Sequence, residues 1–294
     1  MKNLLRLQDL SIEEINNILD LAQSIKDKKI SPLVENKIIA NLFFERSTRT
    51  HYSFATAEAR LGCKTIDFSP NSSSMKKGET FYDTIKTFES FGVDGLVIRD
   101  AKNQWYKELI NKIKVPIINA GDGSADHPTQ TLLDLLTIKQ EFGKFEGLKV
   151  LVVGDISHSR VAHSNILNMR RLGMEVFVSA PDIFKDNQYN YVDFDEYISK
   201  VDVINMLRIQ NERLEKDCKY NVQQYNKEFG LNNERLRKMK PNAIIIHPAP
   251  FNRNVEINDD VIESKPSRIF KQISNGVYVR MAVLLTILRG NNHE

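Results

Sequence analysis

Apolar residues along the chain fall into short β-branched runs separated by longer stretches with helical spacing. Runs of this kind, each followed by a helical pattern, predict βαβ units and therefore parallel sheets. In the first half we expect strands at residues 37–44, 64–68, 95–98 and 115–119, with helices at 48–61 and 79–91. A longer helix should begin at Pro128, where a first-turn proline is tolerated, and end near residue 142, before Gly143.

The second half repeats the alternation and ends in a long helix. Strands are expected at residues 149–153, 175–179, 202–206 and 243–246, with helices at 159–172 and 267–288. The pattern predicts an α/β fold of two lobes, each a parallel β-sheet flanked by helices, with the C-terminal helix packing back on the first lobe. With a junction near residues 130–145, we expect domains at 1–142, completed by the helix at about 276–294, and at 143–275.

The N-terminal residues 1–22 carry an apolar periodicity that predicts an amphipathic helix. Asp9, Glu13 and Glu14 interrupt it before the apolar core of a signal peptide could form. No stretch approaches the roughly 18 to 20 uncharged apolar residues that cross a bilayer, since even residues 279–288 include Arg280. We therefore expect no membrane partner.

Composition narrows the class of protein further. The chain has 294 residues, 41% of them hydrophobic and 27% charged, which is ordinary for a globular protein of two domains. The formal net charge is +3 and the basic residues are spread along the chain, so no nucleic-acid partner is expected. Cys63 and Cys218 lack metal-ligand spacing and form no disulfide framework, which favours a reducing cytoplasm.

Polar and charged residues follow the predicted strands. In open parallel sheets ligands bind beyond the carboxyl ends of the strands, so these positions are the informative ones. In the first lobe they comprise Glu45 to Thr50, Arg99, Gly121 to Gly123 and His127 to Gln130. In the second lobe they comprise Gly154 and Asp155, Ser159 and Arg160, Arg208 to Gln210, and His247 to Pro250.

Two of these segments suggest specific chemistry. Ser47-Thr48-Arg49-Thr50 opens a helix, where hydroxyls, backbone N–H groups, the helix dipole and a guanidinium favour a phosphate. Taken alone, the segment also fits an ordinary N-cap followed by a surface arginine. His127 could polarise a carbonyl and Gln130 could hold an amide, although a lone histidine is more often structural. Gly154-Asp155 lacks the spaced glycines of a dinucleotide site, so no nicotinamide cofactor is expected.

Seven segments in order resemble the aspartate carbamoyltransferase family. They are residues 43–50 (Phe-Phe-Glu-Arg-Ser-Thr-Arg-Thr), 76–79, 97–99, His127-Pro128-Thr129-Gln130, Gly154-Asp155 with Arg160, Arg208-Ile209-Gln210 and His247-Pro248-Ala249-Pro250. The resemblance covers essentially the whole chain. It implies transfer of a carbamoyl group from carbamoyl phosphate to L-aspartate in pyrimidine biosynthesis, without a metal or cofactor. It also implies a carbamoyl-phosphate domain first, an aspartate domain second, and a homotrimer, with regulatory or other pathway chains left open.

The resemblance also implies a role for each matching residue. It places carbamoyl phosphate on Ser47, Thr48, Arg49, Thr50, Arg99, His127, Gln130 and the backbone carbonyls of Ala249 and Pro250. Of these, Thr50, Arg99 and His127 would be catalytic, stabilising the developing oxyanion. It places aspartate on Lys77, Arg160, Arg208 and Gln210. Ser73 and Lys77 would enter the site of the neighbouring subunit.

Three positions depart from the family pattern, and two alternatives stay open. Arg46, His51 and Ala249 stand where proline, arginine and leucine are common. One alternative is a carbamoyltransferase for a different amine such as ornithine. Against it, Arg160, Arg208 and Lys77 suit two carboxylates, and the His-Cys-Leu-Pro signature of the ornithine family is absent. The other alternative is a non-catalytic two-lobed anion-binding protein, which would not explain His127 and Gln130.

Overall fold

The computed structural model describes residues 1–31, 33–34, 36–70, 78–210 and 221–290. The chain divides into two compact units, Met1–Leu136 with Ile273–Glu294, and Thr137–Gln272. Each unit contains one four-stranded sheet in which every pair of neighbouring strands is parallel. The predicted α/β architecture, with one parallel sheet in each lobe, is confirmed.

The sheet of the first unit has the strand order β2-β1-β3-β4. Its strands are β1 (Ile38–Phe43), β2 (Lys64–Phe68), β3 (Gly95–Asp100) and β4 (Ile117–Asp122). The apolar run of β1 is buried from its second residue onward, and β4 is buried throughout, as expected for parallel strands covered by helices. The edge strand β2 is more exposed and carries Lys64 and Asp67, which protect an edge from pairing with another chain.

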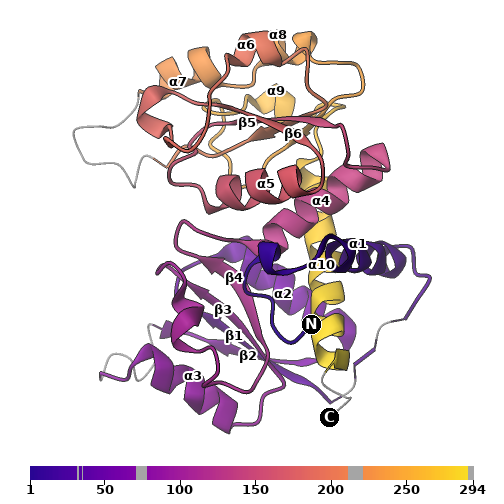
Figure 1. The fold of residues 1–294 in the computed structure, drawn as a ribbon, viewed down its shortest axis with the longest axis vertical. Coiled ribbons are helices and arrows are strands. Elements are labelled where there is room, and N and C mark those ends of the chain that lie inside the picture. Colours follow the sequence, from indigo (N-terminus) through magenta and orange to yellow (C-terminus); the bar gives the residue numbers. More distant parts are fainter. Residues whose placement is uncertain (32, 35, 71–77, 211–220, 291–294) are drawn as a thin grey trace. The chain divides into compact units, whose positions relative to one another are not determined.

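Among its described residues, the first unit contains all or part of five α-helices (Figure 1). They are α1 (Ile12–Lys26), α2 (Thr48–Leu61), α3 (Phe81–Ser90), the start of α4 (Pro128–Phe142) and most of α10 (Ile269–Gly290). The C-terminal helix α10 packs on this unit, as predicted: Arg280 Nη1 donates to Ser53 Oγ at 3.0 Å, and Lys26 Nζ donates to Asn275 Oδ1 at 2.7 Å. Within the described residues, no helix has both the length and the apolar character needed to cross a bilayer.

The second unit has the strand order β6-β5-β7-β8. Its strands are β5 (Lys149–Val153), β6 (Glu175–Ser179), β7 (Val203–Met206) and β8 (Ile244–Ile246). Its helices are α5 (Arg160–Arg171), α6 (Phe194–Tyr197), α7 (Val222–Phe229), α8 (Asn233–Lys238) and α9 (Asp259–Ile262), beside the remaining parts of α4 and α10.

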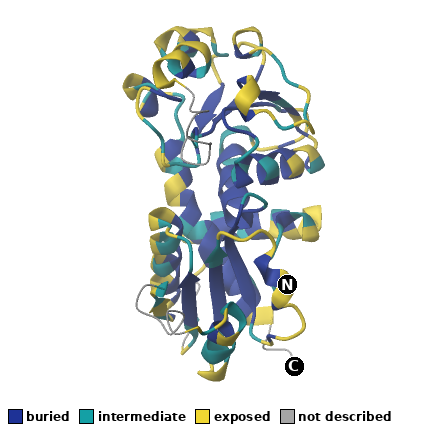
Figure 2. Ribbon diagram, turned by 90° about the vertical axis from the view of Figure 1, so that its left-hand side faces the viewer, coloured by how far each residue is buried: buried dark blue, intermediate teal, exposed yellow. Residues whose placement is uncertain are grey.

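Each sheet anchors its own hydrophobic core. In the first unit Leu42 and Leu96 pack with Trp105, which is 1% exposed. In the second unit Ile204 and Ile245 pack with neighbours from the helices and loops around them. Figure 2 shows the strands at the centre of both sheets as buried, with the exposed residues on the outer helices and loops. The strand ends are thus held on rigid frameworks, which is what a precise binding site requires.

The structure corrects several expected boundaries. The predicted N-terminal helix over residues 1–22 is instead a 3₁₀ turn at Leu7–Asp9 followed by α1. Ser11 causes the late start, because its side chain caps the helix in a capping box with Glu14. Strands β3 and β4 also run further than expected, since Phe43 pairs with Arg99 and Asp100 with Asp122. Arg99 and Gly121 therefore lie within strands, not after them.

A buried carboxyl group joins α2 to the first sheet. Glu58 of α2 is fully buried, and its Oε2 accepts hydrogen bonds from Asn41 of β1 at 3.0 Å and Thr65 of β2 at 2.7 Å. Burial raises the pKa of Glu58 from its usual 4.5 to about 7, and the two hydrogen bonds only partly offset this effect. The folded protein thus binds a proton here that the unfolded chain releases.

This proton predicts that stability falls as the pH rises between about 4.5 and 7, since the folded state binds more protons than the unfolded chain across that window. We expect Glu58→Gln, which cannot ionise, to gain about 2.5 kcal/mol of unfolding free energy over the wild type on going from pH 5 to pH 8. Urea denaturation at fixed protein concentration would measure it, with the exposed Glu263→Gln as the matched control. A difference that does not change with pH would show that Glu58 ionises normally.

Candidate active site

The strand order of the first sheet locates a ligand site. Neighbours β1 and β3 are followed by connections that lead to opposite sides of the strand order, because β1 leads to β2 whereas β3 leads to β4. At such a switch point the residues after the two strands diverge and leave a crevice at their carboxyl ends. Ser47 to Thr50 follow β1, and Arg99 lies next to the last residue of β3. The topology therefore brings both sets of predicted phosphate-binding residues to one end of the sheet.

The N-terminus of α2 is not capped by its own N-cap side chain. Ser47 has the extended backbone of an N-cap residue, yet its hydroxyl accepts no hydrogen bond from the helix. Ser11, Thr80 and Ser159 each accept a backbone N–H at the start of their own helices. Because α2 also has no acidic side chain in its first turn, its N–H groups and dipole favour an anion. Arg49, exposed in that turn, adds a positive charge.

A buried pair links α2 to the segment before α4. Thr50 is 6% exposed and His127 is 5% exposed, and Thr50 Oγ1 lies 3.3 Å from His127 Nε2. Gln130, one turn into α4, donates from Nε2 to Asp134 Oδ1 at 2.9 Å. That bond fixes the amide plane of Gln130, because the NH₂ group must face the carboxylate. Thr50 and His127, predicted to be catalytic, are thus in contact.

Arg99 is held in place by a residue that the sequence patterns left without a role. Its Nη2 lies 2.9 Å from Glu45 Oε2, and its Nη1 donates to the carbonyl of Ala120 at 3.3 Å. Glu45 lies two positions before the predicted phosphate segment, and a local pattern cannot show that it reaches a strand 54 positions away. A bound guanidinium has fewer rotamers to lose when it meets a ligand, so Glu45 preorganises Arg99.

The contact with Thr50 predicts that His127→Ala lowers turnover more than it weakens binding of the carbamoyl phosphate that the sequence resemblance implies as substrate. A donor aimed at a carbonyl oxygen gains strength as that oxygen becomes negative, so its loss appears chiefly in the transition state. We expect a fall in kcat of about 10²-fold to 10³-fold. Steady-state kinetics beside calorimetry would measure the two effects, and equal losses in binding and in kcat/KM would contradict the role.

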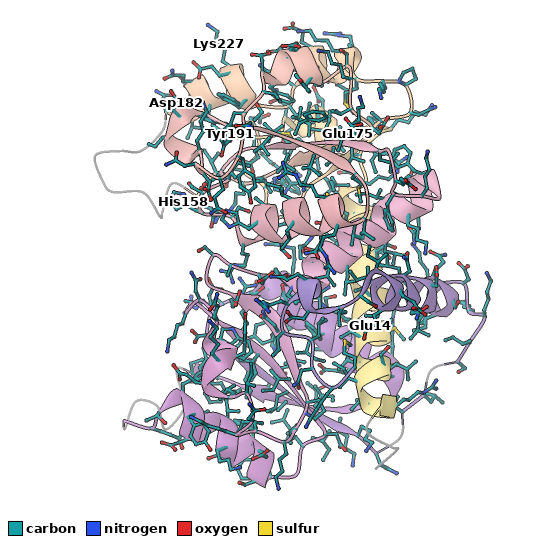
Figure 3. The ribbon with its side chains drawn as sticks, in the orientation of Figure 1. Glu14, His158, Glu175, Asp182, Tyr191 and Lys227 are labelled. Carbon is teal, nitrogen blue, oxygen red and sulfur yellow. The ribbon has the colours of Figure 1, made fainter. Side chains whose placement is uncertain are left out.

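The second unit has an equivalent switch point, between β5 and β7. Asp155, after β5, is fully buried and joins the two loops there. Its Oδ1 accepts from the backbone N–H of His158 at 3.2 Å and lies 2.9 Å from His158 Nδ1, whereas its Oδ2 accepts from Gln210 N at 3.2 Å. Gln210 Nε2 in turn donates to the carbonyl of His158 at 3.1 Å. Figure 3 labels His158, next to the start of α5.

These bonds connect the loop before α5 to the loop after β7, and three of the predicted aspartate-binding residues lie on or next to these two loops. Arg160 begins α5 and is 7% exposed, while Ser159 before it caps the helix by accepting Ala162 N. Arg208 and Gln210 lie on the loop after β7 and are both half-buried. A carboxylate suits the planar guanidinium of an arginine, because the two groups can form two parallel hydrogen bonds.

Ala249 and Pro250, the predicted backbone contacts, lie on the loop that follows β8. They are joined by a cis peptide bond, and Ala249 has a left-handed backbone with φ at +49°. Ser73 and Lys77, the predicted contribution to a neighbouring subunit, lie outside the described residues. In the part of the chain that the structure describes, no cluster of three or more His, Cys, Asp or Glu side chains is arranged to hold a metal ion.

Comparisons with known proteins agree with this geometry. The family model for the carbamoyl-P binding domain of aspartate/ornithine carbamoyltransferases matches residues 2–140, and the model for the Asp/Orn binding domain matches residues 146–287. The solved aspartate transcarbamoylase of Trypanosoma cruzi, in complex with aspartate and phosphate, is 31% identical with a TM-score of 0.90, over 97% of this chain and 96% of that one. The catalytic subunit of M. jannaschii aspartate transcarbamoylase is 34% identical with a TM-score of 0.89, over 100% of both chains.

The fold, with polar and positively charged residues at its two switch points, defines a two-domain α/β protein suited to anionic ligands. Identity above 30% over nearly the whole length, together with both domain models, carries the assignment one step further. The chain belongs to the aspartate/ornithine carbamoyltransferase family.

Proposed function

We propose that this enzyme transfers the carbamoyl group of carbamoyl phosphate to the α-amine of L-aspartate, giving N-carbamoyl-L-aspartate and phosphate. This reaction is an early step of de novo pyrimidine synthesis. The observation that carries the proposal is 31% identity, over 97% of this chain, to the Trypanosoma cruzi aspartate transcarbamoylase whose solved complex contains carbamoyl phosphate and aspartate. Both substrates are anions, which suits the polar residues at the two switch points.

The first unit binds carbamoyl phosphate in this proposal. Its phosphate lies against the N-terminus of α2, where Ser47, Thr48 and Arg49 face it, and Arg99 reaches both its phosphate and its carbonyl. The uncapped first turn of α2 supports this placement, since its N–H donors have no partner in the Ser47 side chain. Thr50 and His127, which contact each other, both bind the carbonyl oxygen of the substrate. Gln130 binds its carbamoyl amide group.

The second unit binds aspartate and completes the carbamoyl contacts. Arg160 and Arg208 each take a carboxylate of the substrate, and Gln210 adds a polar contact. The bonds of Asp155 to both loops support this role, because they hold the arginine-bearing segments in register. The backbone carbonyls of Ala249 and Pro250 accept from the carbamoyl nitrogen and the incoming amine. Residues 1–142 with 276–294 form the carbamoyl-phosphate domain, and residues 143–275 form the aspartate domain.

The chemistry needs orientation and charge stabilisation. The neutral α-amine attacks the carbonyl carbon, and the oxygen becomes negative as a tetrahedral intermediate forms. The bond from carbon to the phosphate oxygen then breaks, and the leaving phosphate takes the proton of the amine. Thr50, Arg99 and His127 stabilise the oxyanion, because preorganised donors in a site shielded from water act strongly on developing charge. Alignment of two small charged substrates contributes much of the remaining acceleration.

The active enzyme is a cytoplasmic homotrimer in this proposal. Ser73 and Lys77 of one subunit enter the site of the next, and Lys77 adds a third positive charge for aspartate. Association with regulatory or other pathway chains is left open.

Phosphate release from carbamoyl phosphate that depends on added L-aspartate tests the function. We expect release with L-aspartate, only background release with L-ornithine or without an amine, and N-carbamoyl-L-aspartate as the product by mass spectrometry. Release with L-ornithine alone would support the ornithine alternative. Tight binding of both anions without any transfer would support a non-catalytic binding protein.

A further inference from the structure

The loop after β8 holds an unusual backbone conformation. Ala249 has φ at +49°, in the left-handed region that a residue with a Cβ rarely adopts. Such a conformation costs free energy and persists only where surrounding contacts fix it. The proposed carbamoyl contacts are the carbonyls of Ala249 and Pro250, so whatever fixes Ala249 also fixes the direction of those carbonyls.

The side chain of His247 makes the contact that fixes Ala249. The imidazole is fully buried, and its Nδ1 accepts the backbone N–H of Ala249 at 2.9 Å. The backbone N–H of His247 donates to Gln272 Oε1 at 2.9 Å, so the residue is tied at both its main chain and its ring. A ring nitrogen that accepts an N–H carries no proton itself. The proton of this imidazole is therefore on Nε2.

The protonated Nε2 faces a second buried group. Glu256 has a fully buried side chain, and its Oε1 lies 3.5 Å from His247 Nε2. The same Oε1 accepts the backbone N–H of Asn252, and Oε2 lies 3.4 Å from Asn252 Nδ2. Glu256 thus contacts His247 at the start of the loop and Asn252 at its end. A carboxylate beside one ring nitrogen favours the tautomer with the proton on that nitrogen.

We infer that His247 and Glu256 are positioning residues for carbamoyl transfer: Glu256 keeps the proton of His247 on Nε2, and Nδ1 then holds the Ala249 N–H so that the loop carbonyls face the substrate. The inference rests on the proposed function. Neither side chain touches substrate, and the pair acts through the backbone of residues 247–252. A histidine protonated on both nitrogens, or a side chain without an acceptor, would release Ala249.

Replacing His247 separates this role from simple packing. His247→Ala removes the acceptor, and a misplacement of about 1 Å at the loop is expected to lower kcat about 100-fold. His247→Asn restores an acceptor, because an asparagine side chain accepts the N–H two residues further along, and should stay within about tenfold of the wild-type kcat. In both variants the KM for carbamoyl phosphate should change less than kcat does, since most of the proposed contacts to that substrate lie in the first unit.

Replacing Glu256 tests the second half of the pair. Glu256→Gln keeps an oxygen that can lie beside His247 Nε2, where Glu256 Oε1 lies 3.5 Å away in the wild type, and should retain most of the kcat, whereas Glu256→Ala should lose it as His247→Ala does. Glu263→Ala, an exposed glutamate of the same unit, is the matched control and should behave as the wild type. In ¹⁵N spectra of the imidazoles, His247 should show a bare Nδ1 and a protonated Nε2, and Glu256→Ala should weaken that preference.

These experiments distinguish a failure of the positioning role from a failure of the proposed function. An active wild type whose His247→Ala and His247→Asn variants have equal kcat, or whose His247 carries its proton on Nδ1, would overturn the inference alone. Parallel loss of kcat and melting temperature in all four variants, without rescue by Asn or Gln, would show a purely structural role and would also overturn it. A wild type without aspartate-dependent phosphate release would overturn the proposed function, while the ¹⁵N spectra would still report the pair.

Discussion

Arg49→Ala is expected to lower kcat/KM by at least about 10³-fold while the protein stays folded. Arg49 lies in the first turn of α2, where the Ser47 hydroxyl leaves the backbone N–H groups uncapped and no acidic side chain competes. Its guanidinium is the positively charged side chain in that turn. Its loss removes a positive charge at the place where negative charge develops on the leaving phosphate. The residue is exposed and adds nothing to the core, so the free energy of unfolding should change by less than about 0.5 kcal/mol.

The measurement combines kinetics with calorimetry of carbamoyl phosphate. Arg60→Ala is the matched control, because Arg60 is also an exposed arginine of α2 but lies at the opposite end, over the ring of Tyr278. The control should keep wild-type turnover and affinity. Unchanged binding of carbamoyl phosphate by Arg49→Ala would show that the phosphate lies elsewhere, and a lowered melting temperature would point to a structural role for the guanidinium.

The elements that the sequence predicts best have local start and stop signals. Helix α2 runs from Thr48 to Leu61 as expected, because Gly62 takes φ at +79° and ends it. Strands β2, β5 and β6 also match, since each is a short run bounded by turn residues. The sequence pattern does not predict the helices α6 to α9. Each spans only four to eight residues, too few for a helical periodicity to stand out.

In the candidate site, too, the sequence predicts the features that are local and misses those that depend on distant parts of the chain. Resemblance to a family names Thr50, His127 and Gln210 individually, because each belongs to a short motif. The contacts between motifs are not local: Thr50 meets His127 across 77 positions, and Gln210 meets Asp155 across 55. No pattern within a window of residues records such pairs, so the supporting roles of Glu45, Asp155 and Glu256 emerge only from the folded chain.

A mixture of two inactive variants is expected to recover activity, because the proposed site takes Arg49 from one subunit and Lys77 from its neighbour. Lys77 lies outside the described residues, so this assignment needs a test that does not depend on its position. Arg49→Ala and Lys77→Ala should each be nearly inactive as homotrimers. In a mixed trimer, a boundary that joins an intact Arg49 to an intact Lys77 contains no altered residue and should work normally.

The expected recovery follows from counting subunits. Unfolding both variants, mixing them in equal amounts and refolding should give about three quarters mixed trimers on a cyclic three-fold assembly. Around any mixed ring, one boundary in three is intact, so activity should reach about one quarter of the wild-type value, from 3/4 × 1/3 of the sites. Native mass spectrometry would confirm the mixed trimers, and phosphate release with L-aspartate would measure the activity.

The control keeps the assembly and removes the complementation. Arg49→Ala refolded with Arg49→Gln also gives mixed trimers, but no boundary then contains an intact Arg49, so that mixture should stay as inactive as its parents. Recovery to about one quarter in the first mixture alone would place Arg49 and Lys77 in one site built from two chains. If the first mixture stays as inactive as its parents although mixed trimers form, Arg49 and Lys77 of the same subunit serve one site, because neither kind of variant subunit then contains both residues intact. That outcome would overturn the shared-site proposal.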